Sequence, residues 1–212
     1  MKRLPFNDAN MLAWLADGKT QTRRVIGEQP EKIEHRDDGW YGWCFAEGWS
    51  WVKLRPRYVV GERVAITEAF RVIDSGYDLD SALLLPSVPP TKTFLADVQY
   101  RADGRLGEAI TVPTLQCSKP AAQPREGWLA ARFMPVWASR SQGTVLNVRA
   151  ERVQNISVAD AIAEGCADHY HGGYEFDYQE LEPAQANFFR LWDSINAARG
   201  YGWDANPHVF VY

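Results

Sequence analysis

Residues 18–24 of the chain read Gly18-Lys19-Thr20-Gln21-Thr22-Arg23-Arg24. This stretch has the densest reactive chemistry in the sequence, because a primary amine, two hydroxyls and two guanidinium groups fall on consecutive residues. It follows a short amphipathic segment near the N-terminus, so it belongs to the first element of the fold. We expect this stretch to form one wall of a ligand pocket.

The segment before it has the pattern of a helix. Met11, Leu12 and Leu15 recur on one helical face, and Asn7 or Asp8 can cap the first turn. Gly18 is predicted to end the helix in the left-handed conformation, after which the chain runs extended to Ile26. In a regular strand the side chains of Lys19 and Thr22 would point to opposite faces, so their convergence requires a bend near Gly18.

The rest of the chain predicts one α+β domain over residues 1–212. We expect a small, mostly antiparallel barrel with flanking helices, because the element order lacks the alternation of a parallel sheet. The proline-rich stretch 74–127 is predicted to be an insertion with one strand, Phe94–Tyr100. Other predicted elements are a polar loop at 27–39, a Trp40–Val52 hairpin and strands at Arg63–Val72, Thr144–Val153 and His208–Tyr212. Two helices are predicted. Ser157 caps the first, with Asp160 in a capping-box-like position, and Gly165 ends it; Pro183 opens the second as its first-turn proline, and Gly200 ends it.

Composition restricts the kinds of ligand. The net charge is −4, whereas proteins that coat long nucleic acids depend on many basic contacts to phosphate, so a nucleoside-sized ligand is favoured. The three cysteines are far apart, which argues against a disulfide framework, and neither a metal nor an organic cofactor is expected. With no apolar run of membrane-spanning length and no signal peptide, the sequence predicts a cytoplasmic protein.

Three side chains could carry chemistry. Glu164 is predicted in the last turn of its helix, where a carboxylate faces the negative end of the dipole, and a nearby cation such as Lys19 would offset that cost. A desolvated Lys19 could have a lowered pKa and accept the proton of the Thr22 hydroxyl, which would make that hydroxyl a nucleophile. The alternatives without catalysis are that Glu164 is simply a solvated helix residue and that Lys19 belongs to a basic strand on the surface.

The aromatic hairpin has two interpretations as well. Trp40, Trp43 and Trp49 could form a platform on which nucleobases stack, or the large rings could pack into the core.

These motifs together resemble ASCH domains of the PUA-like superfamily, and most closely ASCH-type proteins encoded by phages and prophages. The opening signature is Leu15-Ala16-Asp17-Gly18-Lys19-Thr20-Gln21-Thr22-Arg23-Arg24. The further blocks are Gly61-Glu62-Arg63-Val64, Met134-Pro135-Val136-Trp137-Ala138-Ser139-Arg140, Ile156-Ser157 through Glu164-Gly165, Leu191-Trp192-Asp193-Ser194-Ile195-Asn196 and Gly200-Tyr201-Gly202-Trp203-Asp204-Ala205-Asn206-Pro207. They span nearly the whole chain outside 74–127.

The resemblance implies a PUA-like barrel with a cleft for RNA or a nucleobase. A small bacterial ASCH enzyme hydrolyses N(4)-acetylcytidine with a lysine, a threonine and a glutamate, whose motifs match Lys19, Thr22 and Glu164 here. The implied activity is an amidohydrolase acting on an acylated pyrimidine nucleoside. Substrate contacts are expected from Arg23, Arg24, Arg140, Trp40 and Trp43, with an arginine at the developing oxyanion. This chain is about twice as long as the small enzyme.

Other functions remain open at this stage. In a non-catalytic RNA-binding module, basic residues would contact phosphates while tryptophans stack on bases; the basic residues are Lys19, Arg23, Arg24, Lys53, Arg55, Arg57 and Arg140. A metal-independent ribonuclease and a structural role are further alternatives. The expected partner is a modified nucleoside or RNA in each of the first three cases, and the sequence leaves the oligomeric state open.

Overall fold

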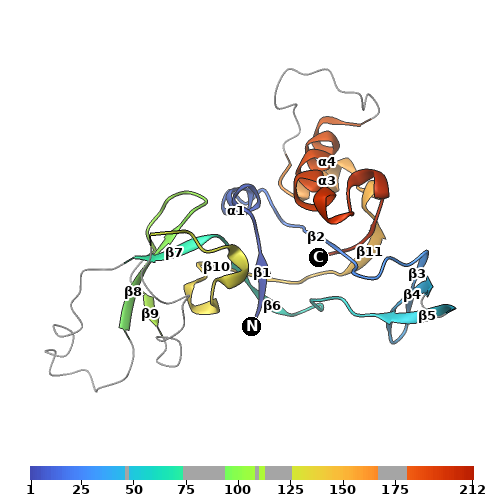
Figure 1. Ribbon diagram of the computed structural model, residues 1–212, viewed down its shortest axis with the longest axis horizontal. Coiled ribbons are helices and arrows are strands. Elements are labelled where there is room, and N and C mark those ends of the chain that lie inside the picture. Colours follow the sequence, from blue (N-terminus) through green and yellow to red (C-terminus); the bar gives the residue numbers. More distant parts are fainter. Residues whose placement is uncertain (46–47, 74–93, 108–109, 113–125, 167–180) are drawn as a thin grey trace, which may run out of the picture. The chain divides into compact units, whose positions relative to one another are not determined.

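The computed structural model describes residues 1–45, 48–73, 94–107, 110–112, 126–166 and 181–212 (Figure 1). The chain divides into two compact units, each built from two separate stretches. Met1–Leu12 and Arg63–Gly143 form the first unit, and Ala13–Glu62 and Thr144–Tyr212 form the second.

The first unit contains two three-stranded sheets. The strands β1 (Lys2–Pro5), β6 (Arg63–Thr67) and β10 (Ser141–Thr144) form one, in which β1 and β6 are parallel. The strands β7 (Phe70–Ile73), β8 (Phe94–Tyr100) and β9 (Ile110–Val112) form the other and are antiparallel. A core cluster contains Phe70, Val72, Val98, Tyr100, Met134 and Ala138, from β7, β8 and the segment that holds the 3-10 helices Ala131–Phe133 and Val136–Ala138, with Met134 between the two.

Where the structure describes it, the second unit contains two antiparallel sheets and two helices. The strands β11 (Arg149–Arg152), β12 (His208–Val211) and β2 (Arg23–Val25) form one sheet, with β12 in the centre. The strands β3 (Lys32–Arg36), β4 (Gly39–Phe45) and β5 (Trp49–Leu54) form the other. The helices are α3 (Val158–Ala163) and α4 (Pro183–Asn196), and the 3-10 helices are Val153–Asn155, Ala197–Arg199 and Trp203–Ala205.

The helix α4 contributes large side chains to the main core cluster of the second unit. Pro183 occupies the first turn, as predicted, and the side chains of Glu182 and Gln185 complete a reciprocal capping box. Phe188 and Trp192 then point from one face into a cluster with Val209. Burying each of these aromatic side chains stabilises the unit by roughly 1.5–3 kcal/mol.

The helix α1 (Asp8–Leu15) forms as predicted, but its termination differs. The left-handed residue is Asp17, with φ 56°, and not Gly18. The amide groups of Gly18 and Lys19 both donate to the carbonyl of Ala13, which closes the turn. Aspartate tolerates this conformation better than most side chains because it is short and polar.

Three predicted boundaries are wrong. The predicted loop 27–39 contains the strand β3. Most of its side chains are exposed and polar, so its sequence lacks the apolar alternation by which a strand is recognised. The predicted strand Arg63–Val72 is two strands that separate at Glu68 and Ala69. Of the predicted strand Thr144–Val153, Thr144 ends β10 and Arg149–Arg152 form β11, while residues 145–148 belong to no strand.

The fold is therefore mixed α+β with mostly antiparallel sheets, and the strand Phe94–Tyr100 is confirmed. In the described ranges the strands pair as four separate three-stranded sheets, and none of these pairings closes a barrel. Most of the predicted insertion 74–127 lies outside the described residues. In the part of the chain that the structure describes, no helix has the length and apolarity needed to cross a membrane.

Candidate active site

The segment after α1 lies against the C-terminal end of α3. The amides of Thr20 and Gln21 donate to the carbonyl of Ala163 at 2.8 and 2.9 Å, and Lys19 forms an isolated antiparallel bridge with Glu164. The last carbonyls of a helix have no partners within the helix, so this docking satisfies them. Ser157 caps the other end of α3 by accepting from the amide of Asp160, as predicted.

This docking brings Lys19 and Glu164 together. The Lys19 Nζ donates to Glu164 Oε2 at 2.6 Å and to the Glu164 carbonyl at 2.8 Å. The two side chains are only 1% and 5% exposed. Burial lowers the pKa of the Lys19 amine, and the charge of Glu164 opposes part of that shift. The sequence prediction that Lys19 compensates the carboxylate at this helix end is confirmed.

Arg23 holds the other oxygen of the same carboxylate. Its Nη1 donates to Glu164 Oε1 at 3.1 Å, while its Nη2 lies 2.6 Å from Glu151 and 3.2 Å from Asp160. The guanidinium is fully buried and contacts the ring of Phe188. Each oxygen of the Glu164 carboxylate is thus held by a different basic side chain, which suits a residue that orients Lys19.

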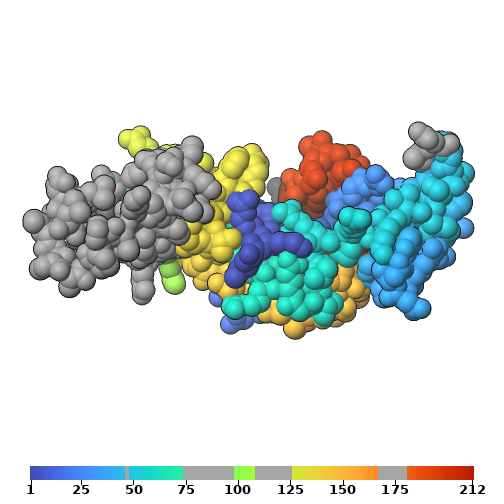
Figure 2. Space-filling view, turned by 90° about the horizontal axis from the view of Figure 1, so that it is seen from below, coloured from blue at the N-terminus to red at the C-terminus, as the bar shows by residue number. Residues whose placement is uncertain are grey.

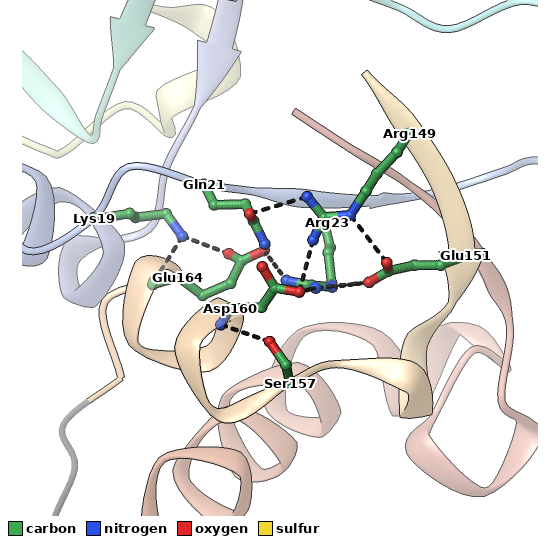
Figure 3. Close-up of polar contacts among 8 residues, drawn as sticks. All are labelled: Lys19, Gln21, Arg23, Arg149, Glu151, Ser157, Asp160 and Glu164. Carbon is green, nitrogen blue, oxygen red and sulfur yellow. Dashed lines mark hydrogen bonds and ion pairs between the residues drawn. The ribbon is translucent and has the colours of Figure 1, made fainter. Parts of the chain in front are cut away.

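Arg149 completes the cluster in Figure 3, in which residues 19–23, β11 and α3 each contribute side chains. Its guanidinium donates to Glu151 at 3.1 Å and to Asp160 at 2.7 Å. Burial would raise the pKa of Asp160, but the nearby Gln21 amide, the hydrogen bond from Arg149 and the charges of Arg149 and Arg23 outweigh it, and the pKa falls below its usual value. Three basic side chains thus face three carboxylates, so the buried cluster is close to neutral while Lys19 is protonated and gains one negative charge when the amine loses its proton.

Thr22 is buried next to this cluster but does not join it. Its backbone pairs with Tyr212 through two hydrogen bonds of 3.0 Å, which extends the pairing of β2 with β12. Neighbouring side chains of an extended strand point to opposite faces, and Arg23 points toward Glu164. Among the described residues, no hydrogen bond joins the Thr22 hydroxyl to Lys19 or Glu164.

The other two predicted arginines have different contacts. Arg24 follows in β2 opposite Phe210, and burial lowers the pKa of its guanidinium. Arg140 belongs to the first unit, where it makes paired hydrogen bonds to Glu68 and to Asp103.

The two predicted tryptophans occupy opposite faces of the β3-β4-β5 sheet. Trp40 packs edge-to-face on Phe210 in a core cluster, whereas Trp43 lies on the opposite face and stacks with Trp49.

Sequence reasoning missed the acids around Arg23. Arg149 and Glu151 are two residues apart in a half-buried strand, so they share a face, and that spacing was an available signal. Asp160 was assigned only to helix capping. It instead binds Arg149 and Arg23, a role that depends on β2 lying beside α3 and has no local signature.

Within the described ranges, no three His, Cys, Asp or Glu side chains are grouped in a way that could hold a metal ion. In comparisons with protein-family models, curated proteins and solved structures, nothing matched this chain. The resemblance to ASCH domains therefore depends on the sequence motifs alone.

Proposed function

We propose that the protein is a metal-independent amidohydrolase that removes the acyl group from a modified pyrimidine nucleoside such as N(4)-acetylcytidine. The observation that carries this proposal is the buried pair of Lys19 and Glu164, 2.6 Å apart. A lysine whose pKa is lowered by burial is suited to act as a general base. The proposal includes membership of the ASCH domains, a PUA-like barrel and a cytoplasmic location, for which the sequence is the support.

The reaction assigns a task to each group. As Thr22 Oγ adds to the acetyl carbonyl, its proton passes to the neutral Lys19 amine. The tetrahedral intermediate then breaks its C–N bond, and the Lys19 proton moves to the departing N4 of cytidine. Water hydrolyses the remaining ester to acetate and restores the hydroxyl.

The charge cluster modifies the roles expected from the sequence. Glu164, held by Lys19 and Arg23, orients the amine rather than protonating the leaving group. Arg23 donates to three carboxylates, so its guanidinium holds Glu164 and is not assigned to the developing oxyanion.

Incubation with N(4)-acetylcytidine tests the proposal, with cytidine and acetate measured by chromatography. We expect Lys19→Ala to lower the rate at least a hundredfold, because general-base catalysis typically contributes 10²–10⁴-fold. The control is Lys2→Ala, which removes an exposed lysine of the first unit and leaves the rate unchanged. A parent protein no faster than Lys19→Ala would contradict the proposal.

Thr22 needs a test of its own because its hydroxyl lacks a hydrogen bond to Lys19. Thr22→Ser retains a hydroxyl and Thr22→Val removes it at nearly constant shape. We expect activity in the serine variant and none in the valine variant. Full activity in Thr22→Val would assign the attack to a water molecule instead.

A further inference from the structure

The β3-β4-β5 sheet has two chemically different faces. In an antiparallel pair, residues directly opposite each other project to the same side, so the register assigns every side chain to a face. Ile33, Trp40 and Leu54 lie on the inner face, where they pack with Ile26 and Phe210.

The outer face consists of aromatic rings and charged groups. We call it the aromatic face, and its side chains are those of Lys32, Glu34, Arg36, Tyr41, Trp43, Phe45, Trp49, Trp51 and Lys53. No aliphatic side chain belongs to it.

The rings form a continuous strip. Trp43 and Trp49 are nearly parallel, with centroids 6.1 Å apart and an interplanar angle of 8°. Phe45 and Trp49 are 67% and 52% exposed, far more than such rings usually are in a folded domain. Residues 32–45 and 48–54, drawn in blue to cyan, reach the surface in Figure 2.

Cations border this strip on both outer strands. Arg36 from β3 lies over the rings of Tyr41 and Trp51, at 4.5 and 4.7 Å from their centroids. Lys53 from β5 lies over Tyr41, at 5.5 Å. With Lys32, the face has three cations against Glu34 and, at its edge, Asp38. Among the described residues its net charge is therefore positive, opposite in sign to that of the whole chain.

The ion pairs on the face leave its cations able to bind an anion. Arg36 contacts Glu34 at 3.0 Å and Lys53 contacts Asp38 at 2.8 Å, but all four side chains are solvent-exposed. Exposed ion pairs contribute little, because water screens them and they restrict two long side chains. Exchange of either carboxylate for a phosphate group therefore costs little.

We propose that the aromatic face binds single-stranded RNA. Alternate residues of a strand are about 7 Å apart, which suits the spacing of successive bases in an extended, unstacked chain. Each base can stack on an exposed ring while Arg36, Lys53 and Lys32 contact phosphates, and stacking of this kind tolerates any base sequence. The cations beside the rings favour a planar ligand with an anionic backbone.

The choice of RNA over DNA rests on the carboxylates. Glu34 on the face and Asp38 at its edge are hydrogen-bond acceptors, and each can accept from a ribose 2′-hydroxyl, which DNA lacks.

The test is a binding titration of the full chain with a fluorescently labelled, mixed-sequence single-stranded RNA at low salt, followed by polarisation. We expect Trp49→Ala to weaken binding roughly tenfold or more, and Trp49→Phe to restore most of it, because any aromatic ring can stack. Arg36→Gln is expected to weaken binding and to reduce its salt dependence. The matched control is Leu146→Ala, which removes an apolar side chain that is 83% exposed in the same unit, with no change in affinity.

Several outcomes would overturn the proposal. They are undetectable binding by the parent, equal affinity in Trp49→Ala, and DNA of the same sequence binding as tightly as RNA. Dimerisation that Trp49→Ala abolishes, seen by light scattering without RNA binding, would assign the face to a second copy of the chain. The RNA contains no acetylated base, so this test is independent of the amidohydrolase assay.

Discussion

Arg23 reaches three carboxylates from a fully buried position. Burying a guanidinium is costly unless its hydrogen bonds are made, and here Glu164, Glu151 and Asp160 accept them. Arg23 also donates to one oxygen of Glu164, while Lys19 donates to the other. Arg23 therefore positions the carboxylate that in turn orients the Lys19 amine. Stability and the geometry of the proposed site thus depend on the same side chain.

Replacement of Arg23 by glutamine should therefore destabilise the protein. We expect the free energy of unfolding to fall by about 3 kcal/mol, the lower end of the range for broken buried pairs, since Glu151 and Asp160 retain contact with water. Urea denaturation followed by circular dichroism measures the loss.

The control for this prediction is Arg55→Gln at an exposed arginine of the same unit, which should change stability by less than about 0.5 kcal/mol. Combining Arg23→Gln with Glu151→Gln should cost less than the two separate losses added together, because each removes a charge that the other would leave unpaired. A loss below about 1 kcal/mol in Arg23→Gln would show that the cluster is not a stabilising one.

The helix α3 is the element that positions Glu164, and its C-terminal turn leaves no space for a side chain. Gly165 follows Glu164 with φ +87°, which L-residues rarely adopt. A Cβ built there would lie 2.6 Å from Cβ of Ala13 and 3.3 Å from Cβ of Lys19. A glycine at this position therefore allows both the helix end and its close approach to Lys19.

We expect Gly165→Ala to lower the free energy of unfolding by more than the roughly 1–2 kcal/mol that a left-handed L-residue costs, because the overlap with Ala13 adds to it. Thermal unfolding followed by circular dichroism would report the change. Gly27→Ala is the matched control, since a Cβ at Gly27 meets nothing within 4 Å. Equal effects in the two variants would mean that the turn at Gly165 adapts easily.

At the scale of the whole molecule, a buried histidine links stability to pH. His208 begins β12, the central strand of its sheet, and its Nδ1 lies 2.9 Å from the carbonyl of Pro30, to which it can donate. Burial lowers the pKa of His208 below 6.5, the nearby charge of Arg152 adds to this, and the hydrogen bond to Pro30 opposes it.

The sign of the resulting effect follows from proton binding. Below pH 6.5 the unfolded chain protonates this histidine more readily than the folded protein does, so stability falls as the pH falls from there through the folded pKa. We expect His208→Gln to reduce that decline in urea denaturation curves measured from about pH 7.5 to 5. His35→Gln, which replaces an exposed histidine, serves as the control and should retain the parent's decline. A His208→Gln protein that loses stability as steeply as the parent would contradict the assignment.

Local sequence signals were enough to predict several elements of the fold. The N-cap at Ser157, the helix end at Gly165 and the first-turn proline at Pro183 were all correct, since each depends on residues within one helical turn. The aromatic hairpin and the final strand were likewise predicted, from alternation along a few residues. The sequence also pointed to Lys19 as the partner of Glu164, from the cost of a carboxylate at a helix end.

Only the tertiary structure decided which side chains meet around that pair. Lys19 and Glu164 are separated by 145 residues, and the acids that bind Arg23 lie 128 to 141 residues away. The sequence could not show that Arg23 rather than Thr22 would join them, because a single residue's shift in the strand exchanges the two faces. It could not separate the inner Trp40 from the outer Trp43 for the same reason: which face of a strand is buried depends on what packs against it.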